Sequence, residues 1–117
     1  MTVASVSPFY GGPARSVTRM ADALTDAGHE VGLWAPDGSV AGTAFLREGS
    51  TVRRMGGGLR DALDSFPGRD VHHDNGIWLP HNHAIAEATL GSRIPRIVST
   101  RGMLIPGAAA ARGGRRI

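Results

Sequence analysis

The stretch VASVSPFYGGPARSVTRMADALTDAGHEVGLWAP, residues 3–36, decides the fold. Residues 3–7 favour a short strand, and a loop rich in proline and glycine follows them. From Pro13 onward, apolar residues recur along one helical stripe until Gly28 supplies a stop signal. Residues 29–36 then favour a second strand. A strand, a helix and a strand in this order predict a βαβ unit.

The rest of the chain continues the alternation of strands and helices. Residues 37–50 carry scattered glycines and are predicted to form mostly loop. Beyond them we expect strands over 51–55, 70–74 and 95–100, and helices over 59–66 and 80–90. Alternating elements of this kind predict an α/β fold, a Rossmann-like parallel sheet with flanking helices.

Length and composition limit the function classes. The chain has 117 residues, of which 41% are hydrophobic and 20% charged, as in a globular domain. All 13 basic residues are arginine, which is typical of codon bias as much as of chemistry, so the net charge of +3 is only a weak signal for a nucleic-acid partner, and none is expected. The absence of cysteine excludes disulfides and thiolate metal sites. No apolar run is long enough to span a membrane, and we expect a cytoplasmic protein.

Ligands of doubly wound sheets collect where the strands end at their carboxyl side. Here that edge would gather residues 11–13, 74–76 and 101–102. Gly11 and Gly12 would let the backbone approach a ligand, and the helix behind them would direct its amino end at a phosphate or diphosphate. The alternative interpretation is that Gly11 and Gly12 bind no ligand and only form a tight turn between the strand and the helix.

A cluster of histidines invites a second interpretation. Imidazole and carboxylate groups are ordinary zinc ligands, and four histidines lie within twelve residues, beside Asp74. However, His72 and His73 would point to opposite faces of a strand, and His81 and His83 would diverge on a helix. This spacing argues against a metal site, and a metal hydrolase is the weakest function we consider.

Four segments taken together resemble the N-terminal domain of the family 4 glycosyltransferases. They are YGGPARSV at 10–17, AGHEV at 27–31, HDNGIWLPHN at 73–82 and STRGML at 99–104. Their order and spacing are similar to that family's from near Met1 to about Pro106. The glycine loop and the H-D-x-G-x-W-x-P segment are the diagnostic parts.

The resemblance implies a GT-B architecture, in which two Rossmann-like domains face each other across a cleft. It implies retaining transfer of a sugar from a nucleotide-diphosphate donor to a glycan or lipid-linked acceptor, with no metal and no further cofactor. On this chain, Gly11 and Gly12 would lie by the donor diphosphate, with Arg15 nearby. Peripheral membrane association is a further expectation from the lipid-linked acceptors.

The resemblance also implies roles for residues at the ends of two later strands. His73, Asp74 and Asn75 would form the floor of the cleft, with His73 and Asp74 near the reacting groups. Arg101 would lie at the end of the next strand, where the wider superfamily often presents a histidine to the sugar or phosphate. Amides and arginine would then stabilise the departing diphosphate.

The chain departs from the family after Leu104. We expect residues 1–106 to form an incomplete N-terminal domain and 107–117 to form a low-complexity tail, as in a truncated or frameshifted transferase gene. The donor-binding domain is missing, so the chain would be inactive alone. The alternatives are a non-catalytic module that binds sugar or nucleotide, and an inactive gene remnant. An uncovered sheet edge would also favour self-association.

Overall fold

The computed structural model describes residues 1–102 as a small mixed α/β structure with parallel strands. The expected tail at 107–117 and the expected domain boundary at 106 lie outside the described residues. The elements in chain order are β1 (Thr2–Val3), the 3-10 turn η1 (Pro8–Tyr10), α1 (Gly12–Asp26), β2 (Gly32–Leu33), β3 (Arg53–Arg54), α2 (Leu59–Asp64), β4 (His72–Asn75), α3 (Pro80–Thr89) and β5 (Arg96–Ser99).

The strands form two parallel sheets, which are joined by one isolated β-bridge. One sheet has the strand order β1-β4-β5, and the other sheet pairs β2 with β3. A parallel bridge between Thr2 and Trp34 joins them, so the strands follow one another as β3-β2-β1-β4-β5. Chain order therefore reverses between β1 and β4. The predicted α/β class with parallel strands and flanking helices is confirmed.

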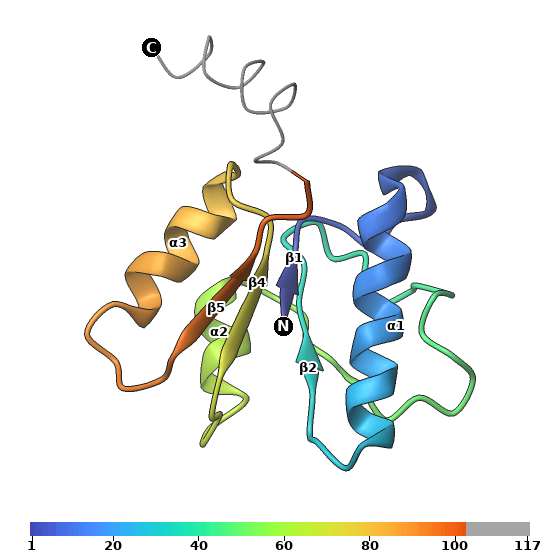
Figure 1. The fold of residues 1–117 in the computed structure, drawn as a ribbon, viewed down its shortest axis with the longest axis horizontal. Helices are drawn as coiled ribbons and strands as arrows, with labels where there is room; N and C mark the ends of the chain where they lie inside the picture. The colour runs from blue at the N-terminus through green and yellow to red at the C-terminus, as the bar shows by residue number, and fades with distance from the viewer. Residues whose placement is uncertain (103–117) are drawn as a thin grey trace, which may run out of the picture.

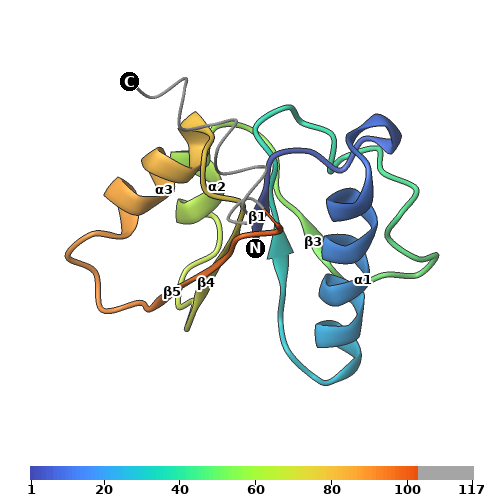
Figure 2. The ribbon, with the colours of Figure 1, turned by 45° about the horizontal axis from the view of Figure 1, so that its top comes forward.

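The helices lie on both sides of the strands. Figures 1 and 2 show α1 on one side and α2 and α3 together on the other. The strands β1 and β4 lead toward the upper edge of Figure 1, where α1 and α3 begin. Within residues 1–102, none of the helices combines the length and apolar character needed to cross a membrane.

The main core forms where α1 packs against β1 and β2. The helical stripe predicted from the sequence supplies Ala14, Val17 and Ala21, each without exposed surface. The strands and the loop after β2 supply the other buried members of this core: Val3, Val6, Val31, Leu33, Ala35, Val40, Leu46 and Val52. Burial of this apolar surface holds the carboxyl end of β1 against the beginning of α1.

The loop at 37–50 is attached to α1 by a buried carboxylate. Asp22, in the last turns of α1, accepts hydrogen bonds from the Arg47 amide at 2.9 Å and the Ser50 hydroxyl at 2.5 Å. The side chain of Arg47 also pairs with Asp26. These contacts hold the irregular segment 37–50 against α1. The sequence, with its scattered glycines, did not predict this attachment.

The strands are shorter than the sequence predicts. The expected strand at 3–7 is a strand only over Thr2–Val3, because the chain then leaves the ladder toward the glycine loop. The Val6 amide donates to the Ser39 hydroxyl at 2.8 Å instead of to a neighbouring strand. The expected strand at 29–36 likewise narrows to Gly32–Leu33 and the bridge at Trp34.

Candidate functional site

The glycine loop lies between β1 and α1 and is open to solvent. Gly11 has φ +97° and ψ −149°, a conformation that only glycine adopts readily. A methyl group placed on Gly11 or Gly12 would meet no atom within 4 Å. No side chain caps the amino end of α1. Pro13 has no N–H, and the Ala14 amide donates to the Gly11 carbonyl at 3.2 Å, so in this first turn the Gly12 amide is the donor that an anion could meet.

An arginine connects this loop to the end of β4. The Arg101 guanidinium donates from Nε and Nη2 to Asn75 Oδ1, at 3.0 and 2.8 Å. Its Nη1 donates to the Ser16 hydroxyl in α1, at 3.1 Å. Arg101 itself has φ +52°, an uncommon conformation for a residue with a side chain. The structure thus brings together the ends of β4 and β5 and the start of α1.

Asn75 is the fixed part of this cluster. The side chain is buried and donates from Nδ2 to the Thr2 carbonyl at 3.0 Å, which ties β4 to β1. Beside it, the Gly76 amide donates to the Ser99 carbonyl at 2.8 Å. Both groups of the Asn75 amide are therefore used, one toward β1 and one toward Arg101. The asparagine holds the guanidinium at the point where strand order reverses.

Arg15 lies apart from this cluster. Its guanidinium stacks over the Phe45 ring, 4.9 Å from the ring centre, on the side of the 37–50 loop. A cation over an aromatic face is held by the quadrupole of the ring and still has donors directed at solvent. The structure therefore joins Asn75 and Arg101 to Ser16, in the helix that follows Gly11 and Gly12, while Arg15 has a different neighbour.

His73 lies on the same strand as Asn75 and two residues before it. Its Nε2 is 2.6 Å from the Ser99 hydroxyl on β5. Burial lowers the pKa of His73, with smaller contributions from the amino terminus and Arg101, so the imidazole is neutral near pH 7. A neutral histidine can hold or pass a proton through the hydroxyl of Ser99.

Asp74 faces the interior and has no exposed surface. Its Oδ1 accepts hydrogen bonds from the Thr2 hydroxyl and from Asn82 Nδ2, both at 2.9 Å. Its Oδ2 lies 3.5 Å from Arg96 Nη2. The carboxylate therefore ties β1, β4, β5 and α3 together, on the opposite face of β4 from His73 and Asn75.

The partner of Asp74 belongs to the same sequence motif. Asn82 also accepts a hydrogen bond from the Leu79 amide at 3.0 Å, at the start of α3. Two polar residues of the HDNGIWLPHN segment, Asp74 and Asn82, thus contact each other in the interior. Sequence reasoning missed this contact, as it missed Ser16 and Ser99, because no local spacing identifies a side chain from another element.

The remaining histidines take up separate environments. His81 is buried and meets the Trp34 ring edge to face, with 6.4 Å between ring centres. His83 lies on the surface and pairs with Glu87. Within residues 1–102, no three histidine, aspartate or glutamate side chains come close enough to hold a metal ion.

Comparison of the chain with protein-family models, with curated proteins and with solved structures gives no significant match.

Proposed function

We propose that this chain is the Rossmann-like N-terminal part of a GT-B glycosyltransferase of the family 4 type, and that its carboxyl edge binds the diphosphate of a nucleotide sugar. One observation carries the proposal. An uncapped helix start behind a glycine turn lies beside a guanidinium that Asn75 orients, between β1 and β4. In doubly wound sheets, this reversal of strand order is the usual ligand position.

The chemistry of the site suits an anion with several oxygens. The Gly12 amide supplies a donor, and the start of α1 supplies the positive end of the helix dipole. Arg101 adds a planar cation, whose hydrogen bonds to Asn75 and Ser16 fix its orientation. Such donors stabilise a diphosphate most when its charge rises on departure, which is the electrostatic contribution a transferase needs.

The acceptor would lie beside the glycine loop. Phe9 is 98% exposed, although it is a large apolar side chain in a short turn, and it adjoins Gly11 through Tyr10. An exposed aromatic ring at a polar edge offers a face for a sugar ring or a lipid-linked acceptor. We assign to His73 the handling of the acceptor proton, and to Asp74 the positioning of β4.

Binding of a nucleotide sugar tests the proposal directly. We expect calorimetric titration with UDP-glucose, and with the GDP and TDP sugars, to show saturable binding by at least one donor. Arg101→Ala should weaken that binding about tenfold or more, since it removes a charged donor. Exposed Arg93→Ala is the matched control and should leave the affinity unchanged. Equal affinities for the two variants would refute the assignment of the site.

A binding module without catalysis is the second candidate function. The complete burial of Asp74 favours it, because the resemblance would put this carboxylate near the reacting groups, where a group without exposed surface cannot contact an acceptor. Radiolabelled donor separates the two functions. Binding without sugar transfer or donor hydrolysis, both alone and with a separately expressed donor domain, would support the module and contradict the transferase.

A further inference from the structure

A histidine and a serine lie in contact where β4 and β5 approach the carboxyl edge of the sheet. Nε2 of His73 is 2.6 Å from Oγ of Ser99, which is short for a hydrogen bond between an imidazole and a hydroxyl. The strands pair His73 with Ile97 and Asn75 with Ser99, so the contact runs diagonally between them. Both side chains are partly exposed, and a ligand can therefore reach the pair.

The alternation of side chains along β4 places the pair on the side of the sheet where α1 lies. Asp74 follows His73 and contacts Asn82 of α3, so His73 points to the opposite face. Figures 1 and 2 show α1 on that side. The Asp74 carboxylate therefore cannot orient the imidazole, and the chemistry of the pair rests on the imidazole and the hydroxyl themselves.

The imidazole of His73 is available as a base. Burial is the main cause that lowers its pKa below the ordinary value of 6.5, so the ring is neutral near pH 7. A neutral imidazole in contact with a hydroxyl can take its proton, which activates the oxygen as a nucleophile. Arg101, two residues beyond Ser99, adds positive charge at the same edge and would favour the oxyanion that forms during acyl transfer.

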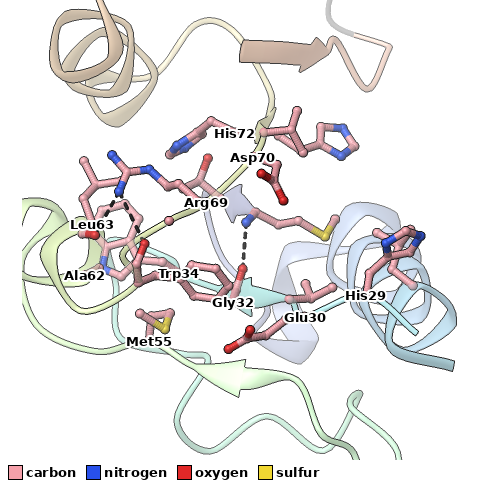
Figure 3. A pocket seen from close by; sticks show the side chains of 18 of the residues that line it. His29, Glu30, Gly32, Trp34, Met55, Ala62, Leu63, Arg69, Asp70 and His72 are labelled. Atoms are coloured by element: carbon pink, nitrogen blue, oxygen red, sulfur yellow. Dashed lines mark hydrogen bonds between the residues drawn. The ribbon is translucent and has the colours of Figure 1, made fainter. Parts of the chain in front are cut away.

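A largely apolar cavity begins beside the pair. It has a volume of about 660 Å³, within the usual range for small-molecule pockets, and opens between β2 and β4 (Figure 3). His73 and Ile97 line it together with Met20 and Leu24 of α1. Ile97 lies two residues before Ser99, so both side chains point to the same face of β5. The Ser99 hydroxyl therefore lies next to a space that an apolar chain can fill.

We propose that Ser99 is the nucleophile of an acyl-transfer site, which takes esters of short apolar acids and holds their acyl chain in this cavity. In the first step, Ser99 Oγ bonds to the carbonyl carbon and the bond from that carbon to the alcohol oxygen breaks. The hydroxyl proton passes through His73 Nε2 to the departing alcohol. In the second step, a water oxygen bonds to the acyl carbon while His73 takes its proton and returns it to Ser99 Oγ, which releases the acid.

This activity is separate from the proposed sugar transfer. Both reactions use the imidazole of His73, but only acyl transfer uses the Ser99 hydroxyl. We therefore expect Ser99→Ala to bind nucleotide sugars as the unchanged chain does. A failure of acyl transfer would leave the diphosphate site untouched, because the ester assay contains no nucleotide.

A chromogenic ester provides the test. We expect para-nitrophenyl butyrate to release nitrophenolate in a burst, and mass spectrometry of the protein to find the butyryl group on Ser99. His73→Gln should slow the burst about 100-fold, since a general base contributes that much. Ser99→Ala should abolish both signals. Exposed Ser92→Ala is the matched control and should change neither.

A second variant keeps the test decisive if loss of the hydroxyl disturbs folding. Ser99→Cys retains a nucleophile beside the imidazole, and we expect it to carry the butyryl group as a thioester. Thermal unfolding of each variant without ester shows whether it folds. A hydrogen bond with only a structural role would change the unfolding temperature in these variants and would give no acyl-protein in the unchanged chain.

The cavity is tested by chain length at two adjacent positions on β5. Relative to uncatalysed hydrolysis, butyrate should react about tenfold faster than acetate, because two more methylenes are buried. Ile97 lines the cavity and Val98 does not. Ile97→Thr should therefore lower this preference about threefold, and Val98→Thr should leave it unchanged.

Three results would overturn the proposal. The first is a butyryl group on His73 or on any residue other than Ser99. The second is nitrophenolate release that Ser99→Ala does not diminish. The third is an equal change of chain-length preference in the Ile97 and Val98 variants, which would place the acyl chain outside the cavity.

Discussion

Arg101 and Asn75 form a forked contact, in which guanidinium Nε and Nη2 both donate to the single oxygen Oδ1. The contact joins residues 26 positions apart at the ends of β5 and β4. Hydrogen bonds to a charged group are worth about 1.5–3 kcal/mol, which is enough to hold Arg101 in its unfavourable backbone conformation. The stability of the carboxyl edge of the sheet, where β4 and β5 end, therefore depends on the contact between Arg101 and Asn75.

A double-mutant cycle measures that dependence. We expect Arg101→Ala and Asn75→Ala each to lower the free energy of unfolding, with a coupling energy of about 1–2 kcal/mol between them. Asn75→Ala should cost more alone, because it also loses the hydrogen bond to the Thr2 carbonyl. Urea denaturation provides the values. Strictly additive losses would show that the fork contributes nothing.

The buried carboxylate of Asp74 should be indispensable for stability. Asp74→Ala leaves the Thr2 hydroxyl and the Asn82 amide without their acceptor and Arg96 without its ion partner. We expect a loss of about 3 kcal/mol or more in the free energy of unfolding, measured by urea denaturation. Asp64→Ala, at an exposed position on α2, is the control and should cost little. Similar losses in both variants would contradict the tying role of Asp74.

The two glycines of the loop should respond differently to the same substitution. Gly11→Ala forces a methyl group into a conformation with φ +97° and should cost about 1–3 kcal/mol of stability. Gly12→Ala starts a helix with normal dihedral angles and open space, so stability should stay unchanged or rise slightly. Thermal and urea unfolding provide the comparison. Equal effects would mean that the loop does not hold Gly11 in this conformation.

Stability should rise with pH between about 4 and 8. Burial lowers the pKa of His72 from 6.5 to about 4 and that of the amino terminus from 8.0 to about 6. Within these windows the unfolded chain binds protons that the folded chain does not, so acid favours unfolding. For His72 alone, the loss from pH 7 to 4 should be about 3 kcal/mol.

Variants separate the two groups that titrate. His72→Gln should flatten the dependence between about pH 4 and 6.5, and acetylation of the amino terminus should flatten it between about 6 and 8. The urea midpoint of unfolding is measured across this pH range. A midpoint that fell as pH rose would contradict the assignment of the titration to His72 and the amino terminus.

The open edge at β5 should cause self-association. Ile97 and Val98 are both exposed on a strand whose outer edge has no paired strand within residues 1–102. Edges of this kind pair with other edges unless charge prevents it. We expect the weight-average mass in sedimentation to rise with concentration, and Val98→Lys to reduce that rise. A monomer at every concentration would contradict the prediction.

Local patterns predicted the helices and turns well. The expected helices at 59–66 and 80–90 are α2 and α3 within two residues at each end, and α1 begins beside Pro13. Apolar spacing and stop signals are set by neighbouring residues, so the sequence shows them directly. The strands were predicted too long, because a strand exists only where another strand pairs with it.

The sequence predicted only part of the candidate site. The glycine loop, Asn75 and Arg101 were expected at one edge, and the structure places Asn75 and Arg101 in contact there, with Ser16 beside the loop. Asp74 was expected beside them but lies in the interior. Side chains alternate between the two faces of a strand, so His73 and Asp74 must point to opposite faces of β4. The alternation does not show which of these faces meets solvent.

The sequence by itself determined the order of strands and helices and the glycine turn before α1. These features rest on periodicity, on caps and on backbone conformations available to glycine. Only the tertiary structure decided that Asp74 is buried against Asn82, and that Arg101 reaches Ser16 from 85 positions away. Such contacts depend on strand register and helix packing, which many distant residues set together.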